Sequence, residues 1–231
     1  MDQESTIAMF DQHAATYDET WKAMSPLRDA LQLVMGNVFV SLPDEANVLC
    51  VGAGTGAEIL YLAQRHPGWR FTAVEPSGPM LAVFRGKAQR EGIASRCTFH
   101  HGYLASLPTS GPFDAATSIL VSQFLTDPTA RRVYFREIAQ RLREGGYLLS
   151  ADLACDMDSD AGRSLLDVWF GMMSVNPAAR ERARGVYGTQ VAVVPPGQVS
   201  ELIAAGGFEM PVQCFQAGLM HGWYARKPVA S

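Results

Sequence analysis

The chain has 231 residues, of which 48% are hydrophobic and 18% charged, and its formal net charge is −4. This length and composition suit one globular domain and exclude a disordered or fibrous chain, and the negative charge argues against a nucleic-acid partner, which would need clustered Lys and Arg. No apolar run approaches the roughly 20 residues that span a bilayer, and Met1-Asp2-Gln3-Glu4 lacks the basic start of a signal peptide, so we expect a cytoplasmic protein with no membrane partner and a small-molecule substrate.

The first part of the chain is predicted to be helical. Residues 5–41 carry apolar positions at helical spacing in two blocks, which divide at Ser25-Pro26, where Ser can cap a helix and Pro can occupy its first turn. We predict an N-terminal helical lid over residues 1–45. Its aromatic residues Phe10, Tyr17 and Trp21 either anchor these helices or close over a ligand.

Residues 48–63 are predicted to form a strand, a tight turn and a helix. The apolar run Val48–Val51 leads into alternating glycines at 52, 54 and 56, after which helical spacing resumes. Glycines let a ligand approach the backbone closely. The start of the following helix then directs free N–H groups and a partial positive charge at that ligand. Glu75 ends the next apolar run and can accept both hydroxyls of a ribose. These features predict a nucleotide-like cofactor.

Two cofactor classes compete for this loop. Gly52, Gly54 and Ala57 also satisfy the dinucleotide fingerprint G-x-G-x-x-A, so a nicotinamide-dependent dehydrogenase is one alternative. A binding module that holds a nucleoside without turnover is another. The rest of the chain must decide between them.

Downstream, strands and helices alternate in the pattern typical of a parallel sheet covered on both faces. We predict strands at 47–51, 70–75, 96–101, 113–119, 146–152, 208–216 and 219–226, and helices at 56–66, 77–91, 128–142 and 195–205. Gly145-Gly146 is predicted to be the left-handed C-cap of the 128–142 helix. The last two strands are too close for a helical crossover, which predicts an antiparallel hairpin.

Residues 155–190 interrupt this alternation with a Met- and Trp-containing segment followed by an Arg-rich one, and we predict a small helical cap there. The predicted fold is therefore α/β: a single domain over 1–231 with a doubly wound, mostly parallel seven-stranded sheet, a terminal antiparallel hairpin, the N-terminal lid and the cap. The four cysteines lie far apart and without nearby ligand histidines, so we predict no metal site.

The chain resembles class I S-adenosylmethionine-dependent methyltransferases across nearly its whole length. The residues that carry the resemblance are the glycine loop, Glu75-Pro76-Ser77-Gly78-Pro79-Met80, Gly102-Tyr103, Phe113-Asp114 and Leu142-Arg143-Glu144-Gly145-Gly146. The resemblance implies a Rossmann-like transferase that uses S-adenosyl-L-methionine and releases S-adenosyl-L-homocysteine. By the same resemblance, the cofactor-binding candidates are Tyr17, Gly52, Ala53, Gly54, Gly56, Glu75, Pro76, Met80, Gly102, Tyr103, Leu104, Leu120 and Gln123.

Two positions depart from the family pattern. Cys50 stands where the family often has an acid that supports the glycine loop or the methionine end of the cofactor, which leaves recognition of the cofactor's amino group to other residues. Tyr103 replaces the acid that frequently meets the adenine amino group.

Within the family, Leu120–Leu125 and the ending Cys214–Ala225 resemble carboxy-S-adenosylmethionine synthases and related small-molecule methyltransferases. The resemblance implies methyl transfer to a small-molecule acceptor. The alternative is a synthase-like enzyme that modifies the cofactor for tRNA wobble uridine modification. A homodimer is a further expectation.

Methyl transfer from a sulfonium is an in-line displacement, so positioning can supply much of its acceleration without a dedicated base. The catalytic candidates are Tyr17 and Gln123. Gln123 follows the fourth predicted strand, and ligands of open α/β sheets lie outside the carboxyl ends of the strands, although Gln123 can equally start a loop that packs on the sheet.

Overall fold

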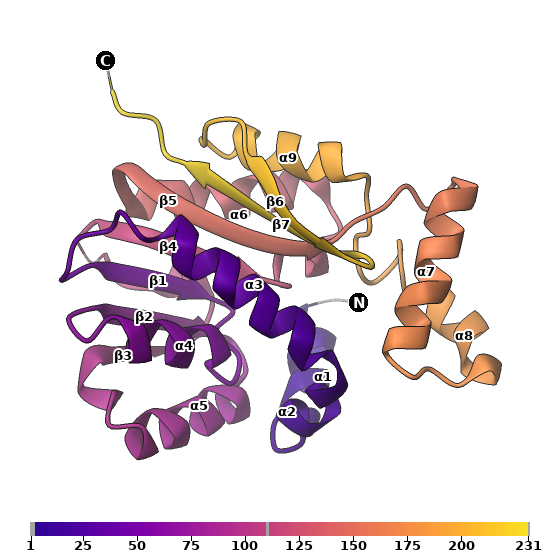
Figure 1. The fold of residues 1–231 in the computed structure, drawn as a ribbon, viewed down its shortest axis with the longest axis horizontal. Coiled ribbons are helices and arrows are strands. Elements are labelled where there is room, and N and C mark those ends of the chain that lie inside the picture. The colour runs from indigo at the N-terminus through magenta and orange to yellow at the C-terminus, as the bar shows by residue number, and fades with distance from the viewer. Residues whose placement is uncertain (1–2, 110, 231) are drawn as a thin grey trace.

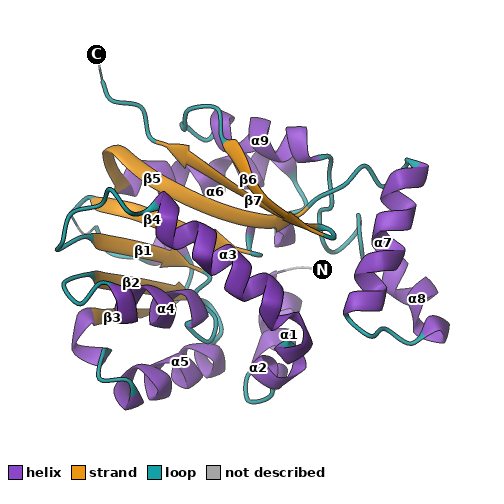
Figure 2. Cartoon of the chain, viewed as in Figure 1, coloured by secondary structure: helices purple, strands orange, loops and turns teal. Residues whose placement is uncertain are grey.

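The structure is a computed structural model that describes residues 3–109 and 111–230. Met1, Asp2, Ser110 and Ser231 belong to the predicted single domain but lie outside the described residues. The described chain contains one seven-stranded sheet with helices packed against both of its faces (Figures 1 and 2). This confirms the predicted fold class.

The strands follow the order β3-β2-β1-β4-β5-β7-β6 across the sheet. The strands are β1 (Asn47–Val51), β2 (Arg70–Glu75), β3 (Cys97–His101), β4 (Phe113–Ile119), β5 (Leu142–Leu153), β6 (Val212–Ala217) and β7 (Met220–Arg226). Neighbouring strands from β3 to β5 pair in parallel, whereas β7 runs antiparallel to both β5 and β6. The predicted terminal hairpin is therefore present, and it extends the sheet beyond β5.

Helices on the two faces of the sheet bury two separate apolar clusters. Successive β1 side chains alternate between them, with Val48 and Cys50 in one cluster and Leu49 and Val51 in the other. This is why β1 appears in the sequence as an unbroken apolar run. The helices that follow core strands are α4 (Ala57–Arg65), α5 (Gly78–Arg90), α6 (Pro128–Arg141) and α9 (Pro196–Ala205).

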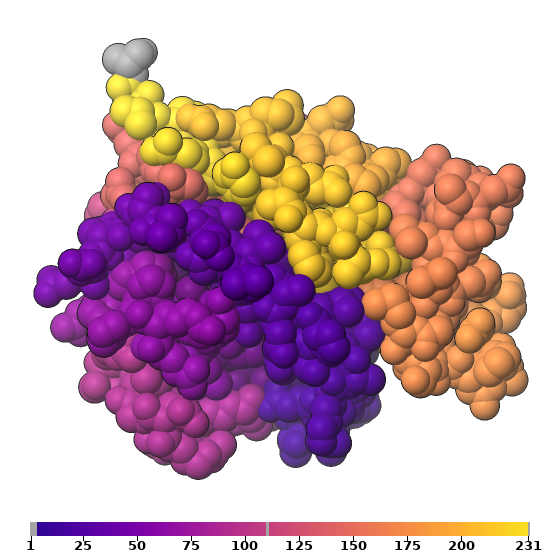
Figure 3. Space-filling model, in the orientation of Figure 1, coloured from indigo at the N-terminus to yellow at the C-terminus, as the bar shows by residue number. Residues whose placement is uncertain are grey.

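The other helices lie at the end of the sheet where the parallel strands finish, apart from the long α3, which crosses one face (Figure 1). The N-terminal ones are α1 (Gln3–His13), α2 (Tyr17–Thr20) and α3 (Ser25–Val38), and the segment between β5 and α9 contains α7 (Asp160–Met172) and α8 (Pro177–Arg184). Short 3₁₀ turns occur at Lys22–Met24, Ala94–Arg96, Leu104–Ser106 and Ser122–Phe124. Figure 3 shows the α7–α8 segment protruding from the body of the molecule.

Local capping explains where the helices begin. The Ser77 hydroxyl accepts from the N–H of Met80 at the start of α5, and the Asp127 carboxylate accepts from the N–H groups of Thr129 and Ala130 at the start of α6. These caps fix the loops that leave β2 and β4. Both loops line the site described below.

The predicted role of Gly145 is wrong. Helix α6 ends at Arg141, and Gly145, with a φ of +68°, lies within β5 rather than at the helix C-cap. Its N–H donates to the carbonyl of Lys227 at 2.9 Å. The left-handed glycine therefore bends the beginning of a strand that starts earlier than predicted.

No helix in the described residues is long and apolar enough to cross a bilayer.

Candidate functional site

Two cavities meet at the carboxyl ends of β1, β2 and β4. The large cavity has a volume of about 600 Å³ and the small cavity about 160 Å³. Both are lined by Tyr17, Gly52, Gly54, Ile119 and Leu120. The glycine loop thus forms the boundary between two compartments, in the place where open α/β sheets bind ligands.

The loop glycines serve different purposes. Gly54 has a φ of +53°, and a Cβ there would meet only Met80 Cε at 3.7 Å, so its backbone faces open space. Gly56 has a φ of +80°, and a Cβ there would lie 1.9 Å from a ring carbon of Phe84. Gly56 is therefore required for packing α4 against α5, and it lines neither cavity. The sequence interpretation of ligand approach fits Gly54 and does not fit Gly56.

Glu75 ties the glycine loop to the start of α5. One carboxylate oxygen accepts from the N–H of Gly54 at 2.8 Å, and the other accepts from the N–H of Ser77 at 2.9 Å. The side chain is only 6% exposed, and burial raises the pKa of Glu75 although both backbone N–H groups oppose the shift. Each carboxylate oxygen has a second lone pair, so Glu75 can still accept from hydroxyl groups in the large cavity that it lines.

Other sequence candidates surround Glu75. Pro76, Met80, Gly102, Tyr103 and Leu104 all line the large cavity. Tyr103 is 40% exposed and so lies at the rim, whereas Met80 and Leu104 are buried. Largely apolar walls with the Glu75 carboxylate at the end of β2 suit a nucleoside, whose base stacks on apolar groups and whose sugar offers paired hydroxyls. The residues present therefore fit the cofactor that the sequence implies.

Leu120 stands between the two cavities in a strained conformation. Its φ of +57° is unusual for a residue other than glycine, and its N–H donates to the carbonyl of Ala151 at 2.7 Å. That hydrogen bond to β5 holds the residue in place. Strain of this kind is often found where a loop must face a ligand.

Tyr17 belongs to both cavities and contacts other aromatic rings of the N-terminal helices. Its ring centroid lies 6.3 Å from that of Phe10 and 6.1 Å from that of Trp21. Burial, followed by the charges of Glu58, Glu75 and Asp18, raises the pKa of Tyr17 to about 12. The phenol therefore keeps its proton near neutral pH, and it can donate a hydrogen bond or form part of the cavity wall.

Gln123 lies in the loop after β4 and is hydrogen-bonded to β5. Its side-chain oxygen accepts from the N–H of Leu153 at 2.9 Å, and its own N–H donates to Asp152 Oδ1 at 3.0 Å. Gln123 is buried and lines neither cavity. This side chain ties the loop after β4 to β5, which is the second of the two placements that the sequence allowed, while the neighbouring Phe124 lines the large cavity. Ala53 lines only the small cavity.

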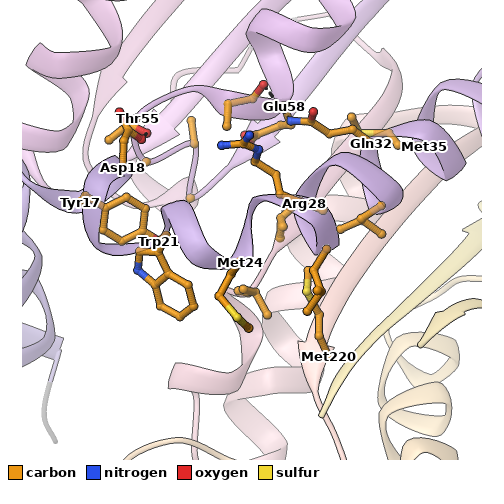
Figure 4. A pocket seen from close by; sticks show the side chains of 18 of the residues that line it. Tyr17, Asp18, Trp21, Met24, Arg28, Gln32, Met35, Thr55, Glu58 and Met220 are labelled. Atoms are coloured by element: carbon orange, nitrogen blue, oxygen red, sulfur yellow. Dashed lines mark hydrogen bonds between the residues drawn. The ribbon is translucent and has the colours of Figure 1, made fainter. Parts of the chain in front are cut away.

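The small cavity contains polar residues that the sequence interpretation did not single out. Figure 4 shows Arg28, Gln32 and Glu58 together at one end of it, with Met24 and Met220 further along. Burial is the main cause that raises the pKa of Glu58 to about 7. In the sequence, Glu58 looks like an ordinary acidic residue in the first turn of a helix, where a carboxylate is favoured by the helix dipole. No sequence signal therefore separates it from a surface residue.

Two carboxylates join the N-terminal helices to the core. Asp18 accepts from Thr55 Oγ1 at 2.7 Å and pairs with Lys87 Nζ at 2.5 Å. Asp11 accepts from the hydroxyl of Ser77 at 2.6 Å. Through these contacts α1 and α2 are attached to the glycine loop and to α5, and they border both cavities.

Comparisons with known proteins agree with this geometry. Residues 48–146 match the model of a family described as a methyltransferase domain. An uncharacterized protein of Synechococcus sp. is 36% identical over 104 residues, which cover 44% of this chain and 24% of that protein. The release factor glutamine methyltransferase of Chlorobaculum tepidum is 31% identical over 154 residues, covering 54% of this chain and 52% of that protein.

Structural comparison extends the likeness beyond the matched segment. An O-methyltransferase family protein from Burkholderia thailandensis has a TM-score of 0.68 at 14% identity, covering 100% of this chain and 64% of that one. The identity is low, so this likeness concerns the fold. The chain spans about a quarter of the length of the Synechococcus protein and about half of the length of the release factor glutamine methyltransferase. Residues 48–146, which contain the glycine loop and Glu75, thus match a methyltransferase domain.

Proposed function

We propose that the chain transfers a methyl group from S-adenosylmethionine to a small-molecule acceptor. The observation that carries this proposal is that a nucleoside-sized cavity containing Glu75 meets a second cavity at Tyr17, Gly54 and Leu120. When bound, the cofactor supplies an activated methyl group, which a nucleophile takes by in-line displacement. The contribution of the chain is to hold the two reactants on either side of this junction.

The dimensions of the small cavity support a small acceptor. Its volume is about 160 Å³, and apolar side chains from several separate elements, Trp21, Met24, Trp169 and Met220 among them, surround much of it. A protein or RNA acceptor would have to insert a single side chain or base there. We also propose that α1–α2 act as a lid over both cavities and that the α7–α8 segment acts as a cap on the acceptor side.

Three roles follow for residues of the site. Glu75 accepts the ribose hydroxyls, the backbone at Gly54 lies against the cofactor, and protonated Tyr17 closes the junction. Positioning of this kind can lower the barrier without a dedicated base, and an acceptor that is already anionic needs none.

Calorimetric titration with S-adenosylmethionine and S-adenosylhomocysteine tests the proposal. The native protein should bind both, and Glu75→Ala should weaken each by roughly 10- to 150-fold, because hydrogen bonds to a charged group contribute about 1.5–3 kcal/mol. Glu91→Gln, at the exposed C-terminal end of α5, is the matched control and should bind like the native protein. Thermal unfolding of each variant shows whether it is folded. Absence of binding by the native protein would contradict the proposal.

The acceptor class requires a second experiment. Labelled cofactor is incubated with panels of thiols, phenols, amines and carboxylates, and with bulk RNA and protein. Label in a small product supports the proposal, whereas label only in RNA or protein rejects the small-molecule acceptor. Mass analysis of the nucleoside after incubation with prephenate tests the alternative of cofactor modification.

A further inference from the structure

The sheet ends at β6 with an edge that has no partner strand among the described residues. β6 pairs with β7 on one side, and no hydrogen bond joins its backbone to any other element within residues 3–109 and 111–230. An edge strand presents a row of free N–H and C=O groups, with which another extended strand can pair. Folded proteins commonly prevent such pairing by placing charged residues on the edge.

The β6 edge carries no such protection. Residues 210–225 contain no Asp, Glu, Lys or Arg, although 18% of the whole chain is charged. Within this stretch, Val212, Gln213 and Gln216 of β6 are exposed. The strand at the opposite edge of the sheet, β3, differs because it follows Arg96 and ends with two histidines. Of the two edges, β6 is therefore the one suited to pairing with another strand.

Four of the six side chains of β6 lie on the face of the sheet that α3 covers. Val212 and Ala217 are opposite residues of β7 that belong to the apolar cluster on this face. Cys214 and Phe215, at the middle of the strand, pack against the same cluster. Apolar residues thus occupy both ends and the centre of β6 on one face.

The other two side chains of β6 lie on the opposite face. Gln213 is opposite Trp223, which belongs to the second apolar cluster, and Gln216 is opposite His221, two residues along β7 and therefore on the same face. An irregularity in the pairing between Gln213 and Phe215 explains why residues three apart share a face. The order along β6 is apolar, Gln, apolar, apolar, Gln, apolar, which is the same in both directions.

This symmetry favours a second copy of the chain as the partner. When two β6 strands run antiparallel with full overlap, the facing pairs are Val212 with Ala217, Gln213 with Gln216, and Cys214 with Phe215. In each pair both side chains lie on the same face of the sheet, as neighbours across two paired strands must. A twofold axis perpendicular to the sheet generates this arrangement, in which both copies use the same surface.

We propose that the chain forms a homodimer in which the β6 strands of two copies pair antiparallel, so that their sheets become one continuous sheet. Apolar surface beside the edge would be covered in the same contact. Leu33 and Val38 of α3 and Tyr224 of β7 line a shallow groove on the α3 face, and Val212 lies opposite Tyr224. Leu33 is 63% exposed and Val212 50%. This surface adds to the strand pair, because stable interfaces bury about 1,200–2,000 Å² in total.

The proposed interface is connected to the small cavity by the β6–β7 hairpin. Met220, at the start of β7, lines that cavity, and so does Trp169 of α7. Gly218, in the turn of the hairpin, lies against the same tryptophan, since a Cβ there would be 3.1 Å from its ring. Pairing of β6 with a second copy would therefore hold one wall of the cavity in place.

Sedimentation velocity over a range of protein concentrations tests the assembly. The native protein should sediment at twice the mass of the 25.1-kDa chain. Gln213→Lys combined with Gln216→Lys places lysine opposite lysine in both symmetry-related pairs. This lysine–lysine variant should weaken association by about 100-fold or more, because like charges that face each other across an interface repel strongly.

Two matched variants control for the added charge. Gln213→Lys combined with Gln216→Glu changes the same two exposed positions but places lysine opposite glutamate, so this lysine–glutamate variant should remain a dimer. Thr98→Lys adds a lysine at an exposed position of β3, the other edge strand, and should also remain a dimer. Thermal unfolding of each variant shows whether it is folded.

Hydrogen exchange followed by mass spectrometry distinguishes strand pairing from contact through side chains alone. In the native dimer the outward N–H groups of β6 are hydrogen-bonded to the second copy, so residues 210–218 should exchange more slowly than in the lysine–lysine variant. Exchange in β3 should be equal in the two proteins.

The outcomes that would overturn the proposal are distinct. They are a native protein that is monomeric at every concentration, a lysine–lysine variant that remains a dimer, and equal exchange of residues 210–218 in both proteins. Loss of the dimer in the lysine–glutamate variant would overturn the antiparallel pairing. None of these measurements uses a cofactor or an acceptor, so their result is independent of the proposed function.

Discussion

At the residue scale, Glu58 couples the stability of the fold to pH. Burial raises its pKa from the ordinary value of 4.5 to about 7. Below pH 4.5 the folded and unfolded states both hold the proton. As the pH rises toward 7, the unfolded state releases it first, so the free energy of unfolding falls by up to about 3 kcal/mol and stays reduced at higher pH.

Glu58→Gln should therefore stabilise the ligand-free protein at pH 8 and have little effect at pH 4. Urea unfolding at the two pH values measures the difference, with Glu91→Gln as an exposed control. If Glu58→Gln is no more stable than the native protein at pH 8, then ionising Glu58 does not lower the free energy of unfolding, and the prediction is wrong.

The comparison of Glu58 with Glu75 shows what the sequence can reveal at this scale. Glu75 ends a predicted strand, and strand ends of a parallel sheet converge, so its position in a ligand cavity follows from the pattern. Glu58 lies on a helix whose facing element, α3, comes from a distant segment. Nothing in the local pattern specifies that pairing. Glu58 also lies near Cys50, whose pKa is raised mainly by burial and next by the charge of Glu58.

At the element scale, Asp18 attaches α2 to the core. Burial acts to raise the pKa of Asp18, but hydrogen bonds from Lys87 and Thr55 and the charge of Lys87 hold it below its ordinary value. The pair is partly exposed, with side-chain exposures of 20% for Lys87 and 48% for Asp18. Such a pair contributes less than about 1 kcal/mol to global stability. Its main effect is on the docking of α1–α2.

We expect Asp18→Asn to speed amide hydrogen exchange in residues 3–24. The substitution should lower Tm by no more than about 4 °C, since a loss of about 1 kcal/mol shifts the Tm of a domain of this size by about 2–4 °C. Glu19→Gln is the matched control, because its pair with Lys22 is exposed, at 76% and 72%. Hydrogen exchange followed by mass spectrometry gives the readout. Unchanged exchange in α1–α2 would show that other contacts, such as Asp11 with Ser77, suffice to hold these helices.

The elements themselves were largely predictable, and the failures have local causes. Predicted strands and helices mostly agree within about two residues, because strand composition and helix periodicity are strong signals. Gly145 was misassigned because a left-handed glycine suits a bent strand as well as a helix end. The sequence could not decide between the two placements of Gln123, because it lies in a short 3₁₀ turn, Ser122–Phe124, in which the direction of each side chain depends on contacts with β5.

At the scale of the whole molecule, a buried polar network joins α6, the loop after β4, and β5. Arg131 Nη2 lies 3.3 Å from Asp152 Oδ1, and their side chains are 1% and 0% exposed. The Arg131 Nε donates to Ser122 Oγ at 2.8 Å, and Ser122 donates in turn to Asp152. Burial raises the pKa of Asp152, while the charge of Arg131 opposes that shift.

Arg131→Met should destabilise the fold by about 3–5 kcal/mol, because it leaves the Asp152 carboxylate buried without its cation. Adding Asp152→Asn should recover part of the loss, since the unpaired charge is then removed. Arg132→Met, at the exposed neighbouring position, is the control and should change stability little. Denaturant unfolding measures all three. A loss that the second substitution fails to reduce would indicate that packing, and not charge, is the function of Arg131.

The shared boundary of the two cavities also affects how the protein would turn over. Tyr17 and the glycine loop border both compartments, and α1–α2 are attached to the core beside them. In the proposed reaction, the spent nucleoside and the methylated product would leave past the same helices. Tight docking of those helices lengthens the dwell time of the reactants, but it also slows release. Turnover would then be limited by product departure, with strong inhibition by the demethylated nucleoside.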